Sequence, residues 1–229
     1  MAKENQRVVL VTGVSTGIGQ ACATHLAAQG FRVYGTSRRP NAALQGAVTM
    51  LAADVTDDRS VEQAVAAILD REHRLDILVN NAGVGVLHKP LIDLPVEEWD
   101  LVMHTNLRAP YLMIRALAPL MAAARSGHII NISSLAGKNP LPQGAAYSAS
   151  KWGLNGLTYS VAEELRQYNV RASVIAPGSV DTHFGAGTST KDRSKMIQPD
   201  DVAQVVAMLV TQASASFVSE VLLRPTMKP

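Results

Sequence analysis

Short apolar, β-branched runs alternate along the chain with longer segments in which apolar residues recur every three or four positions. The short runs predict strands at residues 8–12, 31–36, 48–52, 77–80, 128–133, 171–176 and 220–223. The longer segments predict helices at residues 17–29, 60–72, 97–124, 145–167 and 199–212. Alternation at this spacing predicts the α/β class: a Rossmann-type, doubly wound, mostly parallel seven-stranded sheet with helices on both faces.

Two features refine this prediction. Pro110 and Pro119 indicate that the helical segment at residues 97–124 consists of two pieces, because proline interrupts the hydrogen bonding of a helix. Residues 181–198 show no periodicity and lie between a strand and a helix, a place where substrate loops are common. We expect one dinucleotide-binding and catalytic domain over residues 1–229, with a short substrate loop at about residues 181–198.

Composition and charge narrow the class of protein. The formal net charge is +2 with acidic and basic residues interleaved, so no clustered basic face is expected to bind nucleic acid. The only cysteine, Cys22, has no intrachain disulfide partner, and no apolar run is long enough for a signal peptide or a membrane span. We expect a cytoplasmic protein without a membrane partner. The six histidines are scattered and predict no metal site.

A glycine-rich turn follows the first predicted strand and opens the first predicted helix. Its pattern is Gly-x-x-x-Gly-x-Gly, which lets the backbone approach a pyrophosphate while the helix N-terminus offers free N–H groups. An ordinary strand–helix turn is the alternative. The candidate cofactor-binding residues here are Gly13, Ser15, Thr16, Gly17, Ile18 and Gly19.

The next strand ends supply further candidates. Arg38 follows the second strand, where a guanidinium suits a 2′-phosphate, so NADP(H) is favoured and NAD(H) remains possible. A plain surface charge is the alternative. Strand ends also supply Asp54, Val55, Asn81, Ala82, Gly83, Pro177, Gly178, Val180 and Thr182. Ligands bind at the carboxyl ends of strands in such sheets, although single residues of this kind also serve as caps and turns.

Tyr147 and Lys151 are four residues apart in a predicted helix and therefore share a face. A nearby ammonium lowers the pKa of a phenol, so the pair can exchange a proton with an alcohol or carbonyl oxygen. Taken alone, such a pair is more often solvated surface. Ser133 and Ser134 follow the fifth strand, and either hydroxyl can polarise a substrate oxygen. Asn106 is a candidate for holding a water or backbone group near the lysine, or else a polar interruption of the helix.

Together these motifs resemble those of the short-chain dehydrogenase/reductase family. The resemblance runs from Val8 to about Leu223, with the glycine turn, Asp54-Val55, Asn80-Asn-Ala-Gly83, Asn106, Ser134, Tyr147-x-x-x-Lys151 and Pro177-Gly178 in the family's order. A serine thirteen residues before the tyrosine is typical of the family, which selects Ser134 over Ser133.

The resemblance implies a role for each residue. It makes Tyr147 the general acid/base, Lys151 the ligand of the nicotinamide ribose and Ser134 the group that polarises the carbonyl. It implies that Asn106 helps to hold a water molecule that links Lys151 to solvent. It also implies that four residues line the nicotinamide end: Pro177, Gly178, Val180 and Thr182.

The implied reaction is reversible hydride transfer between NADP(H) and a small-molecule carbonyl/alcohol pair, in a homotetramer or dimer. The short segment at residues 181–198 and the absence of a terminal Gly-Gly turn leave the substrate and the oligomeric state open. The sequence also leaves the direction of the reaction open. A non-catalytic protein that senses nicotinamide nucleotides is the alternative function, and an epimerase of the longer related family is disfavoured by the length of 229 residues.

Overall fold

Parallel strands form the centre of the molecule. The computed structural model describes residues 6–39, 44, 46–184 and 192–229. Within these residues one seven-stranded sheet has the order β3-β2-β1-β4-β5-β6-β7, and every pairing is parallel. Its strands are β1 (Val8–Thr12), β2 (Arg32–Ser37), β3 (Thr49–Ala52), β4 (Ile77–Asn80), β5 (Gly127–Ile132), β6 (Val170–Pro177) and β7 (Glu220–Leu223). The predicted Rossmann-type sheet is confirmed.

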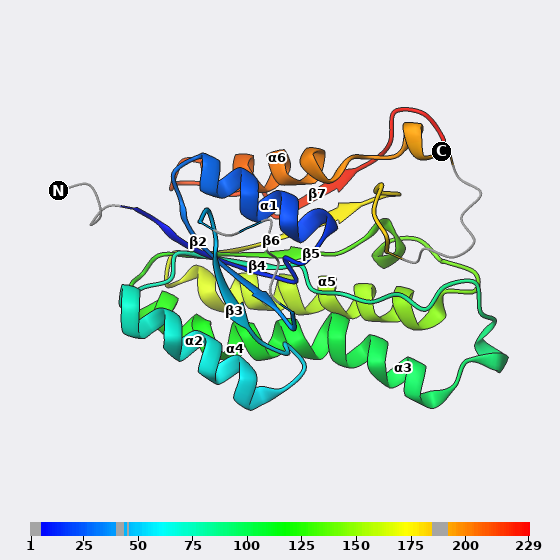
Figure 1. The fold of residues 1–229 in the computed structure, drawn as a ribbon, viewed down its shortest axis with the longest axis horizontal. Helices are drawn as coiled ribbons and strands as arrows, with labels where there is room; N and C mark the ends of the chain where they lie inside the picture. The colour runs from blue at the N-terminus through cyan, green and yellow to red at the C-terminus, as the bar shows by residue number, and fades with distance from the viewer. Residues whose placement is uncertain (1–5, 40–43, 45, 185–191) are drawn as a thin grey trace.

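Helices cover both faces of this sheet (Figure 1). They are α1 (Gly17–Ala28), α2 (Asp58–Glu72), α3 (Val96–Met103), α4 (Ala109–Ala123), α5 (Ala145–Arg166) and α6 (Pro199–Val210). Helices α1 and α6 lie on one face, and α2, α4 and α5 lie on the other. No helix of the described chain is long and apolar enough to cross a membrane.

Two apolar cores hold the layers together, one on each side of the sheet. Alternate residues of β1 divide between them: Val9 and Val11 pack toward α1 and α6, whereas Val8 and Leu10 pack toward α2, α4 and α5. Because side chains alternate along a strand, a strand that is apolar at every position serves both cores. Burial on both faces therefore explains the unbroken apolar run that predicted β1.

The segment at residues 97–124 is helical in two α-helical pieces, as predicted, joined by a π-helical turn (η3, His104–Arg108). Pro110 lies where the π-helical turn passes into α4, and the helix is continuous there. Pro119 lies inside α4, and the helix continues past it. Three short 3₁₀ helices, Leu91–Asp93 (η2), Leu135–Gly137 (η4) and Arg193–Lys195 (η5), were not predicted from periodicity.

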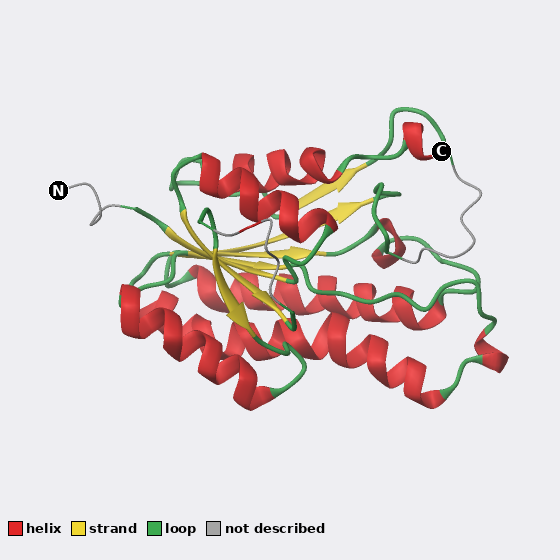
Figure 2. Cartoon of the chain, viewed as in Figure 1, coloured by secondary structure: helices red, strands yellow, loops and turns green. Residues whose placement is uncertain are grey.

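The described part of the predicted substrate loop is anchored to the end of β6. Val180 and Ile197 form an isolated parallel bridge, with Asp181 N donating to Ile197 O at 2.8 Å. Residues 185–191 of the predicted loop lie outside the described residues. The strand arrowheads in Figure 2 point to the same edge of the sheet, so the loops that follow the strands meet there. This edge carries the candidate site.

Candidate active site

The turn between β1 and α1 closes tightly on itself. Gly13 and Gly17 have φ of +72° and +60°, a region that favours glycine. A Cβ on Gly19 would lie 2.3 Å from the Gly13 carbonyl oxygen and 2.4 Å from Asn81 Nδ2. Thr16 at the N-cap makes no side-chain capping bond within the described residues, and the first turn holds no acidic side chain. The turn and the positive end of α1 therefore suit a bound pyrophosphate.

Asn81 fastens the end of β4 to this turn. Its Nδ2 donates to the carbonyls of Thr12 and Gly13 at 2.9 and 3.1 Å. The Thr12 hydroxyl accepts from the backbone N–H of Asn81 and Ala82, each at 3.0 Å. The sequence analysis did not propose Thr12 as a site residue. Its position at a strand end, directly before Gly13, was the available signal.

Arg38 and Asp54 border the end of the cleft that lies beyond the glycine turn. Arg38 is exposed and lines the cleft, whereas Arg39 does not line it. The Asp54 carboxylate accepts from the hydroxyl and the N–H of Thr56 at 2.7 and 2.9 Å. These hydrogen bonds lower the pKa of Asp54, and the charge of Arg38 lowers it further. Arg38 therefore offers an exposed guanidinium to an anionic group in the cleft.

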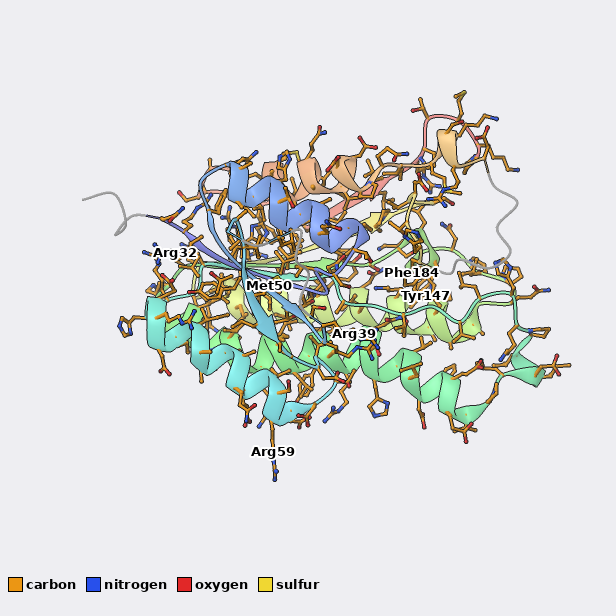
Figure 3. The ribbon with its side chains drawn as sticks, viewed as in Figure 1. Arg32, Arg39, Met50, Arg59, Tyr147 and Phe184 are labelled. Atoms are coloured by element: carbon orange, nitrogen blue, oxygen red, sulfur yellow. The ribbon has the colours of Figure 1, made fainter. Side chains whose placement is uncertain are left out.

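Helix α5 carries Tyr147, labelled in Figure 3, and Lys151, and both residues line the cleft. Lys151 is 4% exposed, and its Nζ donates to the Ile132 carbonyl at 2.9 Å. Its Nζ lies 5.8 Å from the centroid of the Tyr147 ring. Burial lowers the pKa of Lys151 to about 8. The two side chains are thus neighbours inside the protein and do not lie on a solvated helix face.

Ser134 completes this group. Its hydroxyl lies close enough to the Tyr147 hydroxyl to lower the pKa of that phenol, and its Oγ accepts from Ala136 N at 3.1 Å. The Ser133 hydroxyl points to the Lys151 carbonyl instead, at 3.5 Å. The structure therefore brings Ser134, and not Ser133, to the tyrosine.

The pKa of Tyr147 departs from the sequence argument, which expected Lys151 to lower it. Burial raises the pKa of Tyr147, and the hydrogen bond with Ser134 opposes this only in part. The Lys151 ammonium donates to the Ile132 carbonyl, and no hydrogen bond joins it to the Tyr147 hydroxyl among the described residues. In the chain without ligands, Tyr147 therefore holds its proton at neutral pH.

Asn106 lies buried in the π-helical turn between α3 and α4. Its Oδ1 accepts from Val84 N at 2.9 Å, and its Nδ2 donates to Val84 O at 2.8 Å and to Ser150 Oγ at 3.1 Å. A Cβ on Gly83 would lie 3.3 Å from Asn106 Oδ1 and 3.9 Å from Lys151 Nζ. Asn106 thus fixes the backbone that separates it from the lysine, and it does not line the cleft.

The loop after β6 carries the residues that the resemblance assigns to the nicotinamide. A Cβ on Gly17 would lie 3.1 Å from Thr182 Cγ2, so this loop crosses close to the glycine turn. Gly178 N donates to Leu223 O at 2.8 Å, and a Cβ on Gly178 would lie 3.2 Å from both Leu135 and Pro225. The chain after β7 is therefore part of the site.

A cleft of about 1380 Å³ runs from Arg38 to Tyr147. This volume exceeds the roughly 300–1,000 Å³ of a typical ligand pocket, which leaves room for a dinucleotide and a second molecule. The predicted site residues that line it are Gly13, Ser15, Thr16, Gly17, Ile18, Arg38, Asp54, Val55, Asn81, Ala82, Gly83, Ser134, Tyr147, Lys151, Pro177, Gly178, Val180 and Thr182. Gly19 and Asn106 lie behind it as supports.

Sequence reasoning missed part of the lining. The missed residues include Leu87, His88, Asn139, Pro140, Gln143, Arg224, Met227, Lys228 and Pro229. The tail residues could have been found, because β7 ends at the same edge as the other parallel strands. Among the described residues no three His, Cys, Asp or Glu side chains gather as a metal site.

Comparison with known proteins gives consistent results. The sequence profile of the short chain dehydrogenase family matches residues 7–193. An uncharacterised oxidoreductase of Staphylococcus epidermidis is 35% identical over 231 residues, which cover 98% of this chain and 100% of that protein.

Two solved structures also resemble the chain. A metagenomic short-chain oxidoreductase in complex with NADP is 47% identical, with a TM-score of 0.84 over 99% of this chain and 100% of that one. An alcohol dehydrogenase from the archaeon Thermococcus sibiricus, complexed with 5-hydroxy-NADP, is 28% identical, with a TM-score of 0.89 over 98% and 99%. The chain therefore belongs to the short-chain dehydrogenase family of oxidoreductases.

Proposed function

We propose that this chain transfers a hydride between NADP(H) and a carbonyl/alcohol substrate, with Tyr147 as the general acid/base. The observation that carries the proposal is the group formed by Ser134, Tyr147 and Lys151. Ser134 and Tyr147, with the buried ammonium of Lys151 beside them, line a cleft of about 1380 Å³, which has room for a dinucleotide.

The residues of the cleft fit NADP(H). The tight glycine turn and the N-terminus of α1 suit the pyrophosphate, and the exposed Arg38 suits a 2′-phosphate. NAD(H) can use the same turn without the arginine. Two similar solved structures contain NADP or 5-hydroxy-NADP, which supports the assignment. When bound here, NADPH supplies the hydride.

Tyr147 donates the proton in the reducing direction. Hydride addition at the carbonyl carbon moves an electron pair of the C=O bond onto the oxygen, and that oxygen takes the Tyr147 proton. A raised pKa keeps this proton on Tyr147 until the substrate oxygen becomes basic. Ser134 then orients the carbonyl and stabilises its developing charge through a hydrogen bond.

Lys151 and Asn106 support the proton transfer. After the transfer Tyr147 is a phenolate, and the nearby ammonium of Lys151 stabilises that charge. With a pKa of about 8, Lys151 is also able to pass a proton on near neutral pH. Asn106 holds Val84 and Ser150 around the lysine, so we assign it a positioning role.

We further propose that the chain works in the cytoplasm as a homo-oligomer, a dimer or a tetramer. Tyr111 on α4 and Trp152 on α5 are 46% and 52% exposed, and large exposed apolar side chains commonly mark an interface. Sedimentation equilibrium distinguishes a monomer, a dimer and a tetramer directly.

Initial rates test the proposed reaction. Purified protein is given NADPH or NADH with a panel of ketones, and absorbance at the nicotinamide band is followed. The proposal expects NADPH oxidation with at least one ketone, and faster rates with NADPH than with NADH. Tight NADPH binding without turnover on any carbonyl or alcohol would instead favour the nucleotide-sensing alternative.

A further inference from the structure

Large apolar side chains remain exposed beside the catalytic tyrosine. The Phe184 ring lies with its centroid 5.4 Å from that of Tyr147, tilted by 52° (Figure 3). Phe184 is 43% exposed and Leu141 is 36% exposed, and both line the cleft. Exposed apolar surface next to convergent polar groups is typical of a ligand-binding wall.

Two glycines show that these side chains form one continuous surface. A Cβ on Gly85 would lie 2.7 Å from Phe184 Cε1 and 3.7 Å from Leu87 Cγ. A Cβ on Gly144 would lie 2.7 Å from Leu141 Cδ2 and 3.3 Å from Leu87 Cδ2. Leu87 therefore joins the other two side chains, and we call Leu87, Leu141 and Phe184 the apolar wall.

The apolar wall is placed to contact a substituent of the substrate. A carbonyl oxygen held by Ser134 and Tyr147 puts its carbon within reach of the residues that border the tyrosine. Phe184 is such a residue, because its ring packs directly against that of Tyr147. Aromatic rings pack best against other rings in tilted or offset arrangements. A flat ring attached to the carbonyl would use this surface fully.

Charged side chains also line the cleft, but none of the described ones lies between the rings of Phe184 and Tyr147. Asp181 and Arg193 form an ion pair at 2.5 Å. Lys151 is buried and donates to the Ile132 carbonyl. Arg224 and Lys228 are exposed residues of the tail after β7, which packs on Gly178 through Pro225. The side of Tyr147 that Phe184 contacts is therefore apolar and suits an uncharged group.

We propose that the apolar wall selects ketones with an uncharged flat ring attached to the carbonyl carbon, and that Phe184 stacks on that ring. The proposal rests on the proposed carbonyl reduction and adds the substrate class. Phe184 is then a residue that determines specificity and takes no part in proton transfer.

Four ketones of eight carbons test the proposal with NADPH: acetophenone, cyclohexyl methyl ketone, 2-octanone and benzoylformate. We expect acetophenone to have the highest kcat/KM, about 2- to 10-fold above cyclohexyl methyl ketone, from ring–ring contact. Benzoylformate carries the same ring with a carboxylate, and we expect it to be at least about tenfold poorer, because the wall cannot solvate the charge. A preference for 2-octanone or for benzoylformate would overturn the proposal.

Substitutions of Phe184 test whether its ring causes the preference for acetophenone. Phe184→Leu keeps an apolar side chain but removes the ring, so it should remove the preference for acetophenone over cyclohexyl methyl ketone. Phe184→Ala should raise KM for both ring ketones by roughly tenfold. The control is Tyr168→Leu, which alters an exposed ring that does not line the cleft and should change neither ratio. An unchanged ratio in Phe184→Leu would contradict the proposal.

Calorimetry separates failure of this inference from failure of the proposed function. Acetophenone is titrated into protein saturated with NADP⁺, a combination in which no reduction occurs. Tighter binding of acetophenone than of cyclohexyl methyl ketone, lost in Phe184→Leu, supports the apolar wall even if no ketone is turned over. Turnover without this difference in binding would support the proposed reaction and contradict the proposed role of the apolar wall. Benzoylformate binding that depends on Arg224 or Lys228 would show selection for an acidic substrate instead.

Discussion

Tyr147 keeps its proton because the folded chain buries it, and Lys151 loses part of its basicity for the same reason. Burial disfavours the charged form of each group, so the phenol becomes a weaker acid and the ammonium a stronger one. The two pKa values therefore move apart, because that of Tyr147 rises above its ordinary value of 10.0 while that of Lys151 falls from 10.5 to about 8. Tyr147 thus gives up its proton only to a strongly basic oxygen, which suits the acid role that we propose for it.

Arg38 should determine the preference for NADPH. Arg38→Ser removes the guanidinium that we assign to the 2′-phosphate, so KM for NADPH should rise about 10- to 100-fold, as expected for the loss of a hydrogen bond to a charged group. KM for NADH should change little. Steady-state kinetics with both nucleotides measure this. Arg39→Ser, one residue away and outside the cleft lining, is the control, and an equal effect of both changes would refute the assignment.

Gly19 should tolerate no side chain. In Gly19→Ala the new Cβ would lie 2.3 Å from the Gly13 carbonyl oxygen, so the glycine turn must open and both stability and nucleotide affinity should fall. Gly156 provides a matched helical control, since nothing lies within 4 Å of its Cβ position. Gly156→Ala should stabilise by about 0.5–1 kcal/mol through helix propensity. Chemical denaturation and NADPH titration measure both, and a stable Gly19→Ala that binds NADPH normally would contradict this account.

Helix α5 and strand β5 connect the core to the site. Asn80, Asn131 and Thr158 form a buried chain of hydrogen bonds at 2.8 Å from β4 through β5 to α5. Asn155, also on α5, donates to the Gly137 carbonyl at 2.9 Å. Because these bonds lie within one or two turns of Lys151, they fix where α5 places its catalytic face. Buried polar groups need such partners, and satisfied networks favour one arrangement of the elements.

Periodicity located each of these elements to within two residues at either end, because burial of one or both faces dictates the apolar pattern. It did not predict the π-helical turn around Asn106, which depends on side-chain bonds to Val84 and Ser150 from other segments. It treated Pro119 as an interruption, yet α4 is held in place by packing on both sides of that residue. Tertiary contacts decided these two features.

His128 on β5 should make the fold sensitive to acid. Ser173 donates its proton to Val218 O at 2.6 Å, so His128 Nε2–H donates to the Ser173 oxygen at 2.8 Å. His128 Nδ1 is buried without a partner among the described residues. Burial, reinforced by Arg171 and Arg7, lowers the pKa of His128 from 6.5 to about 3. Between these values only the unfolded chain takes up the proton, so stability falls as the pH falls below 6.5.

Replacement of His128 tests whether this residue makes the stability of the fold depend on pH. Relative to His128→Asn, the wild-type protein should lose up to about 1.4 kcal/mol of unfolding free energy per pH unit below pH 6.5. Denaturant unfolding at pH 7, 6, 5 and 4 measures the difference. His73→Asn changes an exposed histidine and controls for the substitution itself. Parallel pH profiles of the wild type and His128→Asn would show that His128 is not the acid-sensitive group.

The parallel sheet gathers the site from distant parts of the sequence. Loops after β1, β2, β3, β4, β5 and β6, together with the tail after β7, all reach the cleft because every strand ends at one edge. Most motif residues were predictable because they follow a strand, whereas Tyr147, Lys151 and Asn106 lie in helical segments and were identified from helical spacing and from the resemblance. Leu87 was not identified in this way, because its place beside Leu141 and Phe184 depends on how two long loops fold over Gly85 and Gly144.

A ligand that bridges this edge should stabilise the fold. At a concentration 100 times its Kd, NADPH should add about 2.7 kcal/mol, which raises Tm by roughly 5–10 °C for a chain of this size. NADH at the same concentration should raise it less, because it makes no contact with Arg38. Differential scanning fluorimetry measures both shifts. Equal Tm shifts with NADPH and NADH would refute the proposed 2′-phosphate site. So would a difference between the two shifts that is unchanged in Arg38→Ser.

The central proposal is proton transfer by Tyr147, and single-turnover kinetics of Tyr147→Phe test it most directly. The substitution removes the hydroxyl and leaves the ring that packs against Phe184. NADPH affinity, measured by fluorescence titration, should stay within about twofold, while the rate of hydride transfer to a ketone that the wild type reduces should fall by about 10²- to 10⁴-fold. Hydride transfer by Tyr147→Phe at a rate near that of the wild type, with NADPH bound normally, would contradict the account.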